Sequence, residues 1–413
     1  MKLLISQFFV VAGFFGFNFA FGHNIFETLM FPNTLKSPNK KISSYINKVR
    51  AESIKKVFLH SYNGYRKYAW GHDELRPVSN GTVNNFNCWG MTIIDSLDTM
   101  IIMNLRKEYQ EAREFVKENL DFGMKQGCGS RYASVFETNI RYLGGLLAAY
   151  DLTGDELYLN KSILLGNLLL PAFNTPTGIP TGEIDIVEKK GVIGSESSLA
   201  AVGTLQLEFR RLSELTGNPI YLHKAQKVLD VIQSKKAPLP GLYPIFIDPY
   251  RGRFGKDWIS WGAYGDSFYE YLLKQYIMVR ETVPQYIDMW KLAVKSTVEN
   301  LVVSVRGFPE LQYLAQWNNN KLIFEMEHLA CFSGGNFILG ARTLNDQSLL
   351  DLGLSLTSTC YNTYLGTGTQ LGPEQFGWDQ PIRYTNFPPN RQFQEFGYSV
   401  TNSRYPLRPE VVE

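Results

Sequence analysis

The hydrophobic and polar positions of this 413-residue chain predict pairs of helices. The segment DLTGDELYLNKS at residues 151–162 resembles ELTGNPIYLHKA at residues 214–225. In each segment the Gly is typical of the residue that ends a helix, and the Asp or Pro after it is typical of one that begins the next. Both segments are therefore predicted to be turns between two helices. The apolar runs that flank them are residues 136–150, 164–173, 199–212 and 228–232.

Looser copies of the same pattern follow along the chain. Residues 266–280 pair with 286–303, and residues 328–344 pair with 348–364. Helix pairs that recur at intervals of roughly 60 residues indicate a helical array. The first helix of each pair is rich in small residues and apolar on most faces, as the inner helix of a two-layered ring would be. These small residues include Gly144, Gly145, Ala148, Gly262, Ala263, Gly334, Gly335 and Gly340. We predict an all-α fold in one domain, an α/α barrel, with an open solenoid as the alternative.

The first 22 residues form a separate, strongly apolar segment. Its longest uninterrupted run, residues 8–17, suits a signal peptide and is short for a membrane span. We predict a signal peptide over residues 1–22, with a signal anchor as the alternative. A short stem over residues 23–43 and a folded domain over residues 44–413 would follow. We therefore expect a secreted protein or one in the lumen of the secretory pathway.

The composition limits the partners that the chain can have. Charged residues make up 19% of the sequence and the formal net charge is +2, so no basic surface for nucleic acid is predicted. Membrane contact is expected only if the N-terminal segment is an anchor. Two N-x-S/T motifs, at Asn80 and Asn160, are candidate N-glycosylation sites. The four cysteines lack metal-like spacing, which indicates one or two disulfides.

Acidic residues at the predicted starts of inner helices are the candidates for chemistry. Glu137 and Arg141 stand four residues apart, so they share one face of their helix. A surface ion pair is the competing interpretation, but the apolar residues around them leave little room for a solvated face. Asp266 lies in the segment GDS, which is equally typical of a helix N-cap.

Other acidic residues lie in polar segments: Asp98 in DSLDT, Glu374 in GPEQF, and Glu410 and Glu413 beside Arg408. Glu410 and Glu413 are three residues apart and would share one helical face. Cleavage of a glycosidic bond requires a protonated acid at the leaving oxygen and an ionised base that activates water. Carboxylates crowded together would differ in pKa, and this difference would assign the two roles.

Aromatic residues could stack on sugar rings, although each is also typical of a core. The candidates are Trp70, Trp89, Trp261, Phe332 and Trp378. The sequence holds no P-loop, no H-E-x-x-H and no G-x-S-x-G motif, and its five histidines argue against a His-rich metal site. No other catalytic template competes with a glycosidase.

Seven segments, in order along the chain, carry a resemblance to a known family. They are residues 68–77, 94–99, 136–145, 171–180, 265–274, 328–332 and 407–410. The chain resembles the class I α-1,2-mannosidases, glycoside hydrolase family 47. The resemblance implies an (αα)7 barrel and an inverting, Ca²⁺-dependent removal of terminal α-1,2-linked mannose from high-mannose N-glycans. The segment YAWGHDEL at residues 68–75 favours the hydrolase branch over the lectin-like branch.

The resemblance also implies a role for each candidate residue. Glu137 matches the general acid, Glu410 the general base and Asp266 the third essential carboxylate. Glu374 matches a further acidic position that is sometimes assigned as a proton donor. The residues implied to bind substrate are Asp98, Arg141, His328, Arg408 and Glu413. The implied disulfide joins Cys331 and Cys360, and whether Cys88 pairs with Cys128 stays open.

The family pattern continues beyond the point where this sequence ends. In the family, the Arg-Pro-Glu segment begins an inner helix, and a further helical segment and a hairpin follow. That later segment carries the Thr that binds Ca²⁺. We therefore expect a ring that is incomplete at its C-terminal end, no metal ligand among the present residues, and weak or absent activity.

Two alternatives remain open at the level of sequence. A non-catalytic mannose-binding protein could use the same acidic residues to bind mannose or N-glycan without turnover. A glycosidase of another α/α-barrel family is the second alternative. We expect a monomer in each case. The order in which mannose branches are removed is not encoded in any of these motifs.

Overall fold

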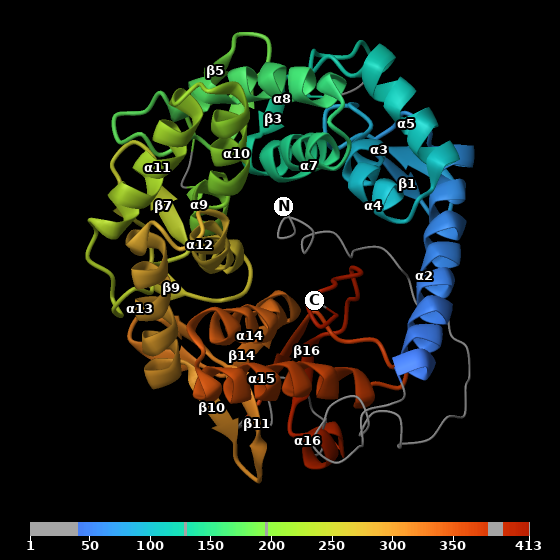
Figure 1. Ribbon diagram of the computed structural model, residues 1–413. Coiled ribbons are helices and arrows are strands. Elements are labelled where there is room, and N and C mark those ends of the chain that lie inside the picture. The colour runs from blue at the N-terminus through green and yellow to red at the C-terminus, as the bar shows by residue number, and fades with distance from the viewer. Residues whose placement is uncertain (1–39, 128–129, 195–196, 379–390, 413) are drawn as a thin grey trace.

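The structure is a computed structural model that describes residues 40–127, 130–194, 197–378 and 391–412 (Figure 1). The predicted signal peptide, most of the predicted stem, Cys128 and Glu413 lie outside the described residues. The pairing of Cys88 with Cys128 therefore stays open. None of the described helices combines the length and the apolar character needed to cross a bilayer.

The helices form a ring of two layers (Figure 1). The inner layer consists of α3 (Met91–Asp95), α4 (Leu97–Ile102), α6 (Val135–Glu137), η2 (Thr138–Leu143), α7 (Gly144–Thr153), α9 (Leu199–Gly203), α10 (Gln206–Thr216), α12 (Asp266–Met278), η4 (His328–Cys331) and α14 (Phe332–Leu344). The outer layer consists of α5 (Arg106–Asn119), α8 (Glu156–Leu169), η3 (Leu170–Phe173), α11 (Ile220–Gln233), α13 (Pro284–Asn300) and α15 (Gln347–Leu365). Inner helices contact one another in the order α4, α7, α10, α12, α14. The predicted helix pairs are confirmed.

Two further helices lie at the edge of this arrangement. The long helix α2 (Lys40–Tyr68) runs along one side of the ring, and the short helix α16 (Arg391–Phe396) lies near α15 (Figure 1). The described chain then turns inward, and its last residues reach the middle of the ring (Figure 1). This path brings the C-terminal residues among the inner helices.

The two segments that resemble each other form the predicted turns. Gly154 ends α7 and Gly217 ends α10, with left-handed φ values of 71° and 68°. Only glycine adopts this backbone conformation without steric cost. The Asp155 side chain then caps α8 by accepting a hydrogen bond from the Leu157 N–H at 3.1 Å. Local sequence chemistry therefore determines both the end of one helix and the beginning of the next.

Small residues allow the helices to pack closely, both between the two layers and within the inner layer. A Cβ atom added to Gly340 would lie 2.0 Å from the Trp290 ring, and one added to Gly203 would lie 2.3 Å from the Phe268 ring. Both distances are shorter than the non-bonded contacts that Cβ atoms make in proteins. The buried side chains form one continuous hydrophobic core that joins the two layers.

Short antiparallel sheets stand where several inner helices begin, and the periodicity of the sequence did not predict them. The sheets are β1 (Glu74–Arg76) with β2 (Gly81–Val83); β3 (Tyr132–Ser134), β4 (Glu183–Asp185) and β5 (Lys190–Gly191); β6 (Ser197–Ser198), β7 (Phe246–Asp248) and β8 (Arg253–Phe254); β9 (Trp258–Ile259), β12 (Gln316–Asn318) and β13 (Lys321–Ile323); and β14 (Glu325–Glu327), β15 (Gln375–Gly377) and β16 (Ser399–Asn402). β3 leads directly into α6, β6 into α9 and β14 into η4. The sheets thus hold the starts of inner helices.

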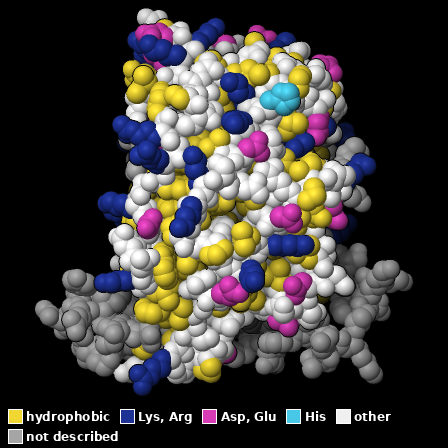
Figure 2. Space-filling view, turned by 90° about the vertical axis from the view of Figure 1, so that its left-hand side faces the viewer, with side chains coloured by type: hydrophobic (Ala, Val, Ile, Leu, Met, Phe, Trp, Pro, Cys, Tyr) yellow, Lys and Arg dark blue, Asp and Glu magenta, His cyan; other side chains and the backbone are white. Residues whose placement is uncertain are grey.

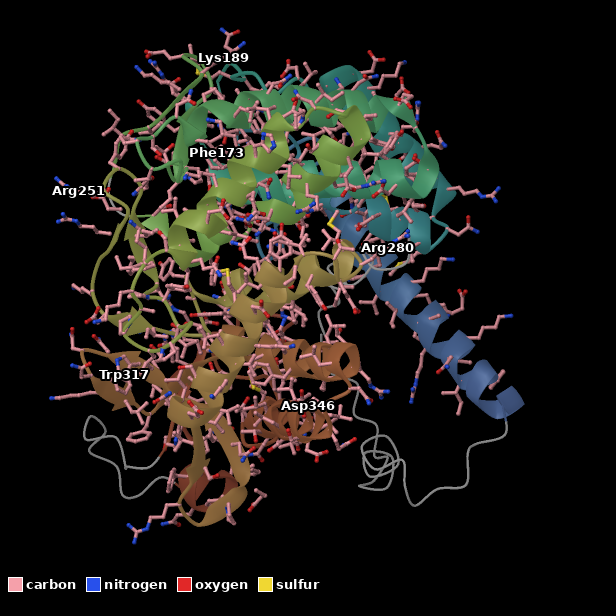
Figure 3. All side chains as sticks on the ribbon, turned by 60° about the vertical axis from the view of Figure 1, so that its left-hand side comes forward. Phe173, Lys189, Arg251, Arg280, Trp317 and Asp346 are labelled. Carbon is pink, nitrogen blue, oxygen red and sulfur yellow. A yellow bond between two sulfur atoms is a disulfide. The ribbon has the colours of Figure 1, made fainter. Side chains whose placement is uncertain are left out.

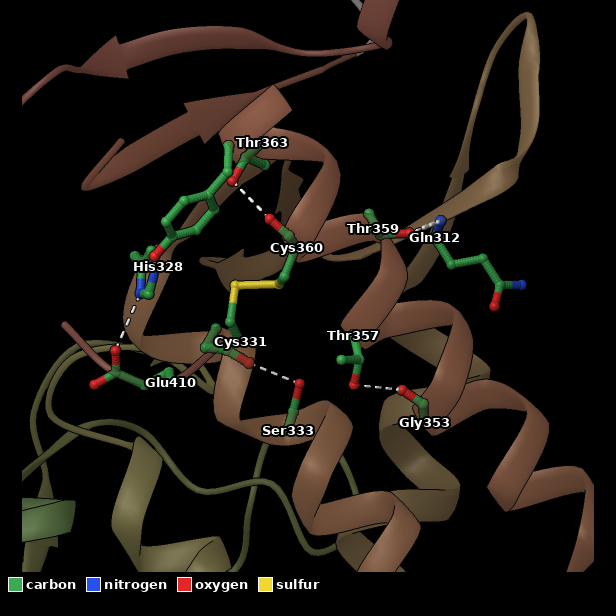
Figure 4. The surroundings of a disulfide bond; sticks show 12 residues. Gln312, His328, Cys331, Ser333, Gly353, Thr357, Thr359, Cys360, Thr363 and Glu410 are labelled. Carbon is green, nitrogen blue, oxygen red and sulfur yellow. Dashed lines mark hydrogen bonds and ion pairs between the residues drawn. A yellow bond between two sulfur atoms is a disulfide. The ribbon is translucent and has the colours of Figure 1, made fainter. Parts of the chain in front are cut away.

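A disulfide fastens the start of one inner helix to its outer partner (Figure 4). Cys331 at the end of η4 is bonded to Cys360 on α15, with 5.9 Å between their Cα atoms. This pairing confirms the disulfide that the family resemblance implied. Outside the ring, β10 (Val302–Val305) and β11 (Phe308–Leu314) form a hairpin that packs on α15.

The outer surface is mixed in charge. Figure 2 shows Lys and Arg side chains interspersed with Asp and Glu over one face of the molecule. Figure 3 shows the side chains of Lys189 and Arg251 pointing outward from peripheral loops. Both candidate glycosylation residues are exposed: Asn80 lies in the turn between β1 and β2, and Asn160 lies on α8.

Candidate functional site

Glu137 lies where an α-helical turn changes into a π-helix. It is the last residue of α6, and the π-helix η2 follows at once. The Arg141 Nε donates a hydrogen bond to Glu137 Oε2 at 2.8 Å. Short π-helical turns occur frequently at functional sites. The predicted pair is present, and about a third of each side chain is exposed.

A second carboxylate contacts the same guanidinium, and the sequence analysis did not select it. The Arg141 Nη1 donates to Asp95 Oδ2 at 3.3 Å, and Asp95 is the last residue of α3. Burial raises the pKa of Asp95, while the Arg141 charge opposes that rise. The signal available in the sequence was its position three residues before Asp98, in the segment DSLDT.

Asp98 is more deeply buried than Asp95. It lies in the first turn of α4 with 4% of its surface exposed, and its Oδ1 accepts the Thr99 N–H at 2.6 Å. Burial raises the pKa of Asp98 to about 7. Its closeness to Asp95 adds to that rise. Protein covers the Asp98 side chain, and its role in substrate binding stays a prediction.

Asp266 begins α12, as the sequence predicted. Its Oδ1 accepts the Ser267 N–H at 2.8 Å, so it does not cap the helix in the usual way through a later N–H group. Burial raises the pKa of Asp266 to about 7, and the charges of Glu270, Glu410 and Glu327 contribute. A carboxyl group that titrates near neutral pH can act as an acid or as a base there.

Glu410 lies against His328, although the two come from distant parts of the chain. Glu410 Oε2 and His328 Nδ1 are 3.0 Å apart (Figure 4). His328 Nε2 is 2.6 Å from the Tyr364 hydroxyl. A neutral imidazole with its proton on Nδ1 satisfies both contacts, because Nδ1–H donates to the carboxylate and Nε2 accepts from the hydroxyl. Only 13% of the Glu410 side chain is exposed.

The chain around Glu410 does not form the inner helix expected from the family pattern within the described residues. Residues 403–409 have no regular structure, and residues 410–412 form a turn. In this turn the Val412 N–H donates to the Pro409 carbonyl at 2.7 Å. Glu413, expected on the same helical face, lies outside the described residues.

Arg408 and Glu374 form a two-point ion pair. Arg408 donates from Nε to Glu374 Oε2 at 2.6 Å and from Nη2 to Oε1 at 2.5 Å. Both oxygens of this carboxylate are therefore occupied by a permanent cation. This geometry makes Glu374 better suited to positioning Arg408 than to donating a proton.

Glu327 is a further acidic residue of this group that the sequence analysis did not select. Its Oε2 accepts the Ala263 N–H at 2.6 Å, and its Oε1 accepts from the Gln375 amide at 3.2 Å. A Cβ atom at Gly262 would lie 2.4 Å from Oε2, so this approach requires glycine. Its position next to His328 in the segment EMEH was the available signal.

Asp73 holds the loop in front of α3 in place. Its two oxygens accept four backbone N–H groups, from Phe86, Cys88, Gly90 and Met91, at 2.8–3.2 Å. The side chain is completely buried. Asp73 lies in the segment YAWGHDEL, and its role here is to shape the backbone that leads to Asp95.

Most of the aromatic residues considered for sugar stacking belong to the core. Trp89, Trp261, Trp378 and Phe332 each expose 5% or less of their surface. Trp70 is partly exposed and lines a groove of about 530 Å³ between α2 and α5. For the four buried residues, the core interpretation is correct.

The candidate residues fall into two groups. Asp95, Asp98, Glu137 and Arg141 form the first, and Asp266, Glu327, His328, Glu374, Arg408 and Glu410 form the second. No hydrogen bond or ion pair in the described part of the chain joins Glu137 to Glu410. Over the same residues, no three or more His, Cys, Asp or Glu side chains converge as the ligands of a metal ion would.

Known proteins match both the sequence and this fold. A family model for glycosyl hydrolase family 47 matches residues 57–413. The mannosyl-oligosaccharide alpha-1,2-mannosidase of Coccidioides posadasii is 38% identical over 403 residues, which cover 93% of this chain and 76% of that protein. The mannosyl-oligosaccharide 1,2-alpha-mannosidase IA of Sus scrofa is 40% identical over 373 residues, which cover 87% of this chain and 53% of that protein.

A solved structure confirms the fold. The alpha-1,2-mannosidase from Trichoderma reesei superposes with a TM-score of 0.83 at 36% identity, and the match covers 89% of this chain and 79% of that one. The ring of helix pairs is thus the (αα)7 barrel that the resemblance implied. With most of its length matched by one family of glycosidases, this chain belongs to glycosyl hydrolase family 47.

Proposed function

We propose that the chain hydrolyses terminal α-1,2-linked mannose in high-mannose N-glycans, with inversion at the anomeric carbon. The observation that carries this proposal is the separation of its carboxylates into two groups, one around Glu137 and Arg141 and the other around Glu410 and Asp266. An inverting glycosidase needs an acid on one side of the sugar and a base on the other, with room for a water molecule between base and sugar. Glu137 and Glu410 belong to different groups, as this requires.

Glu137 is the proposed general acid. Its Oε2 is bonded to Arg141, and no hydrogen bond within the described residues reaches its Oε1. One oxygen is therefore free to carry the proton that the leaving oxygen receives. About a third of the side chain is exposed, so a substrate can reach it.

Glu410 is the proposed general base. The His328 imidazole orients its carboxylate through Oε2, and the other oxygen can accept a proton from the attacking water. Asp266, whose pKa is raised to about 7, is the third carboxylate and lies close enough to Glu410 for the two charges to interact.

The remaining candidates are proposed to bind the sugar. Arg141 and Arg408 supply hydrogen-bond donors beside the three carboxylates, and the bond to Glu374 fixes the orientation of Arg408. His328 acts on the bound sugar through the carboxylate of Glu410, to which it is hydrogen-bonded. Asp98 and Glu413 complete the set expected from the family, the latter outside the described residues. A high-mannose oligosaccharide offers many hydroxyl groups to such donors and acceptors.

Family membership is compatible with a requirement for calcium, which we include in the proposal. The described residues do not by themselves form a site that fits the ion, since no three or more of their His, Cys, Asp or Glu side chains converge on one point. No step above is therefore assigned to calcium. We also propose that residues 1–22 direct the chain to the secretory pathway, that residues 44–413 form the catalytic domain, and that Asn80 and Asn160 carry glycans.

Proton NMR of the protein with α-1,2-mannobiose tests the proposal. With Ca²⁺ present, the first mannose released is expected to be the β anomer, and a chelator is expected to abolish the release. Initial release of the α anomer would contradict inversion. Release that continues unchanged in the chelator would contradict the calcium requirement alone, and no release at all would contradict the assignment of hydrolysis to this chain.

A further inference from the structure

Arg141 contacts two carboxylates, and only one of them has a role in the proposed function. Its Nε donates to Glu137, and its Nη1 donates to Asp95. Nε and Nη1 lie on different edges of the planar guanidinium. Two bonds from different edges fix the rotation of the plane, which one bond alone would not do.

Asp95 is the more deeply placed of the two partners. Its side chain is 21% exposed, compared with 32% for Glu137, and its Oδ1 is buried without a hydrogen-bond partner among the described residues. The Phe86 ring lies under the guanidinium, 5.4 Å from ring centre to Arg141 Cζ. Arg141 is therefore held by Asp95 at one edge of the guanidinium and by the Phe86 ring at its face. Glu137 binds at Nε and is the more exposed of the two carboxylate partners.

The backbone that carries Arg141 is also held. Asn139, in the same π-helical turn, donates through Nδ2 to the Thr204 carbonyl at 3.2 Å and to Glu208 Oε2 at 2.9 Å. These bonds fasten η2 to the helix pair α9 and α10. The turn that carries Arg141 is thus fixed by contacts that do not involve Glu137.

The second arginine of the site shows what happens without a competing carboxylate bond. Arg408 pairs with Glu374 through Nε and Nη2, and both carboxylate oxygens are occupied. Arg141 pairs with Glu137 through Nε alone. The difference between the two pairs coincides with the bond from Arg141 to Asp95.

We propose that Asp95 is a positioning residue that turns the Arg141 guanidinium so that only one oxygen of Glu137 is bound and the other stays free for the proton. The inference rests on the proposed function, because it assumes that Glu137 donates a proton. Without Asp95, the guanidinium would rotate into the two-point pairing seen at Glu374. A carboxylate bound in that way is stabilised as the anion and is a poor proton donor.

The test compares two substrates that differ in their need for an acid. The variant Asp95→Asn keeps the shape of the side chain and removes its charge, so its amide oxygen is a weaker acceptor for the Arg141 guanidinium than the Glu137 carboxylate is. With α-1,2-mannobiose, whose leaving oxygen needs a proton, kcat is expected to fall about 10-fold or more, with little change in KM. With α-mannosyl fluoride, which needs far less protonation, kcat is expected to change by less than about 3-fold. Equal losses on both substrates, or no loss on either, would overturn the inference.

Two controls separate this inference from the proposed function. Glu137→Gln is expected to show the same split between substrates, only larger. If Glu137→Gln shows no split, the role of Glu137 as the acid in the proposed function is wrong. If Glu137→Gln shows the split and Asp95→Asn does not, only the role of Asp95 is wrong. Asp151→Asn is the matched control, because Asp151 on α7 forms an ion pair of 2.6 Å with Arg211 on α10. This variant is expected to affect turnover of the two substrates equally.

A crystal structure of Asp95→Asn gives a readout that does not require turnover. Arg141 is expected to contact both oxygens of Glu137 in the variant. If Arg141 still contacts only Oε2, the inference is overturned even in a chain that shows no activity. The crystal structure of Asp151→Asn provides the matched comparison, in which the contact between Arg141 and Glu137 is expected to stay unchanged.

Discussion

His328 Nδ1 lies 3.0 Å from Glu410 Oε2, although the two residues are 82 positions apart in the sequence. Tyr364, on the outer helix α15, holds the other ring nitrogen at 2.6 Å. The disulfide between Cys331 and Cys360 links η4, which carries His328, to α15, which carries Tyr364. The orientation of His328, which binds the proposed base, is therefore fixed by its contact with α15.

Two substitutions of His328 separate its two hydrogen bonds. An Asn amide nitrogen can take the place of Nδ1, and a Gln amide can take the place of Nε2. If orientation of Glu410 is what matters, His328→Gln should lower kcat by about 10- to 100-fold, and His328→Asn should lower it less. Steady-state kinetics on α-1,2-mannobiose measure the difference. His223→Gln, on the exposed face of α11, is the control. An equal loss in both His328 variants would contradict this role.

Glu137→Gln distinguishes an enzyme from a mannose-binding protein. An amide cannot donate the proton that the leaving oxygen needs, so turnover should fall by about 10²- to 10⁴-fold. Binding of α-1,2-mannobiose, measured by isothermal titration calorimetry, should persist. Glu299→Gln, on the exposed side of α13, should leave both quantities unchanged. Full turnover in Glu137→Gln would exclude Glu137 as the acid.

Stability is expected to decrease as the pH rises through neutrality. Burial raises the pKa of Glu208 to about 7, above its ordinary value of 4.5. The folded state therefore binds this proton more tightly than the unfolded state does. The resulting stabilisation is complete below about pH 4.5 and is lost as the pH rises through about 7. Asp98, with a pKa of about 7, acts in the same direction.

Urea denaturation at pH 5 and pH 8 measures this effect. The free energy of unfolding should be lower at pH 8 by about 1–3 kcal/mol for each such carboxyl group. Glu208→Gln mimics the protonated form and should reduce the difference between the two pH values. Glu214→Gln, an exposed glutamate on the same helix α10, should leave it unchanged. A higher stability at pH 8 than at pH 5 would contradict the prediction.

Asp73→Asn should destabilise the whole domain. An amide replaces one of the two oxygens that accept backbone N–H groups, so two buried donors lose their partner. The free energy of unfolding should fall by about 2–4 kcal/mol. Asp248→Asn is a matched control, because Asp248 also accepts two backbone N–H groups but lies in an open turn. A loss of similar size in both variants would argue against a special role for the buried loop.

The sequence by itself determined the helix pairs and the residues from which the site is built. Gly154 and Gly217 end their helices because only glycine adopts the left-handed conformation freely, which is a local property. The spacing of Glu137 and Arg141 placed both on one face, since residues four apart in a helix are neighbours. The disulfide and the roles of the carboxylates came from the family resemblance, whose segments are ordered along most of the chain.

Only the tertiary structure decided which residues meet. Asp95 and Glu327 acquire their partners from elements 46 and 64 residues away, and no periodicity encodes such contacts. The small sheets also escaped prediction, because strands of two to four residues are too short to show a clear alternating pattern. Asp98 and Glu208 have raised pKa values because the ring buries them, and burial is a property of the whole packed ring.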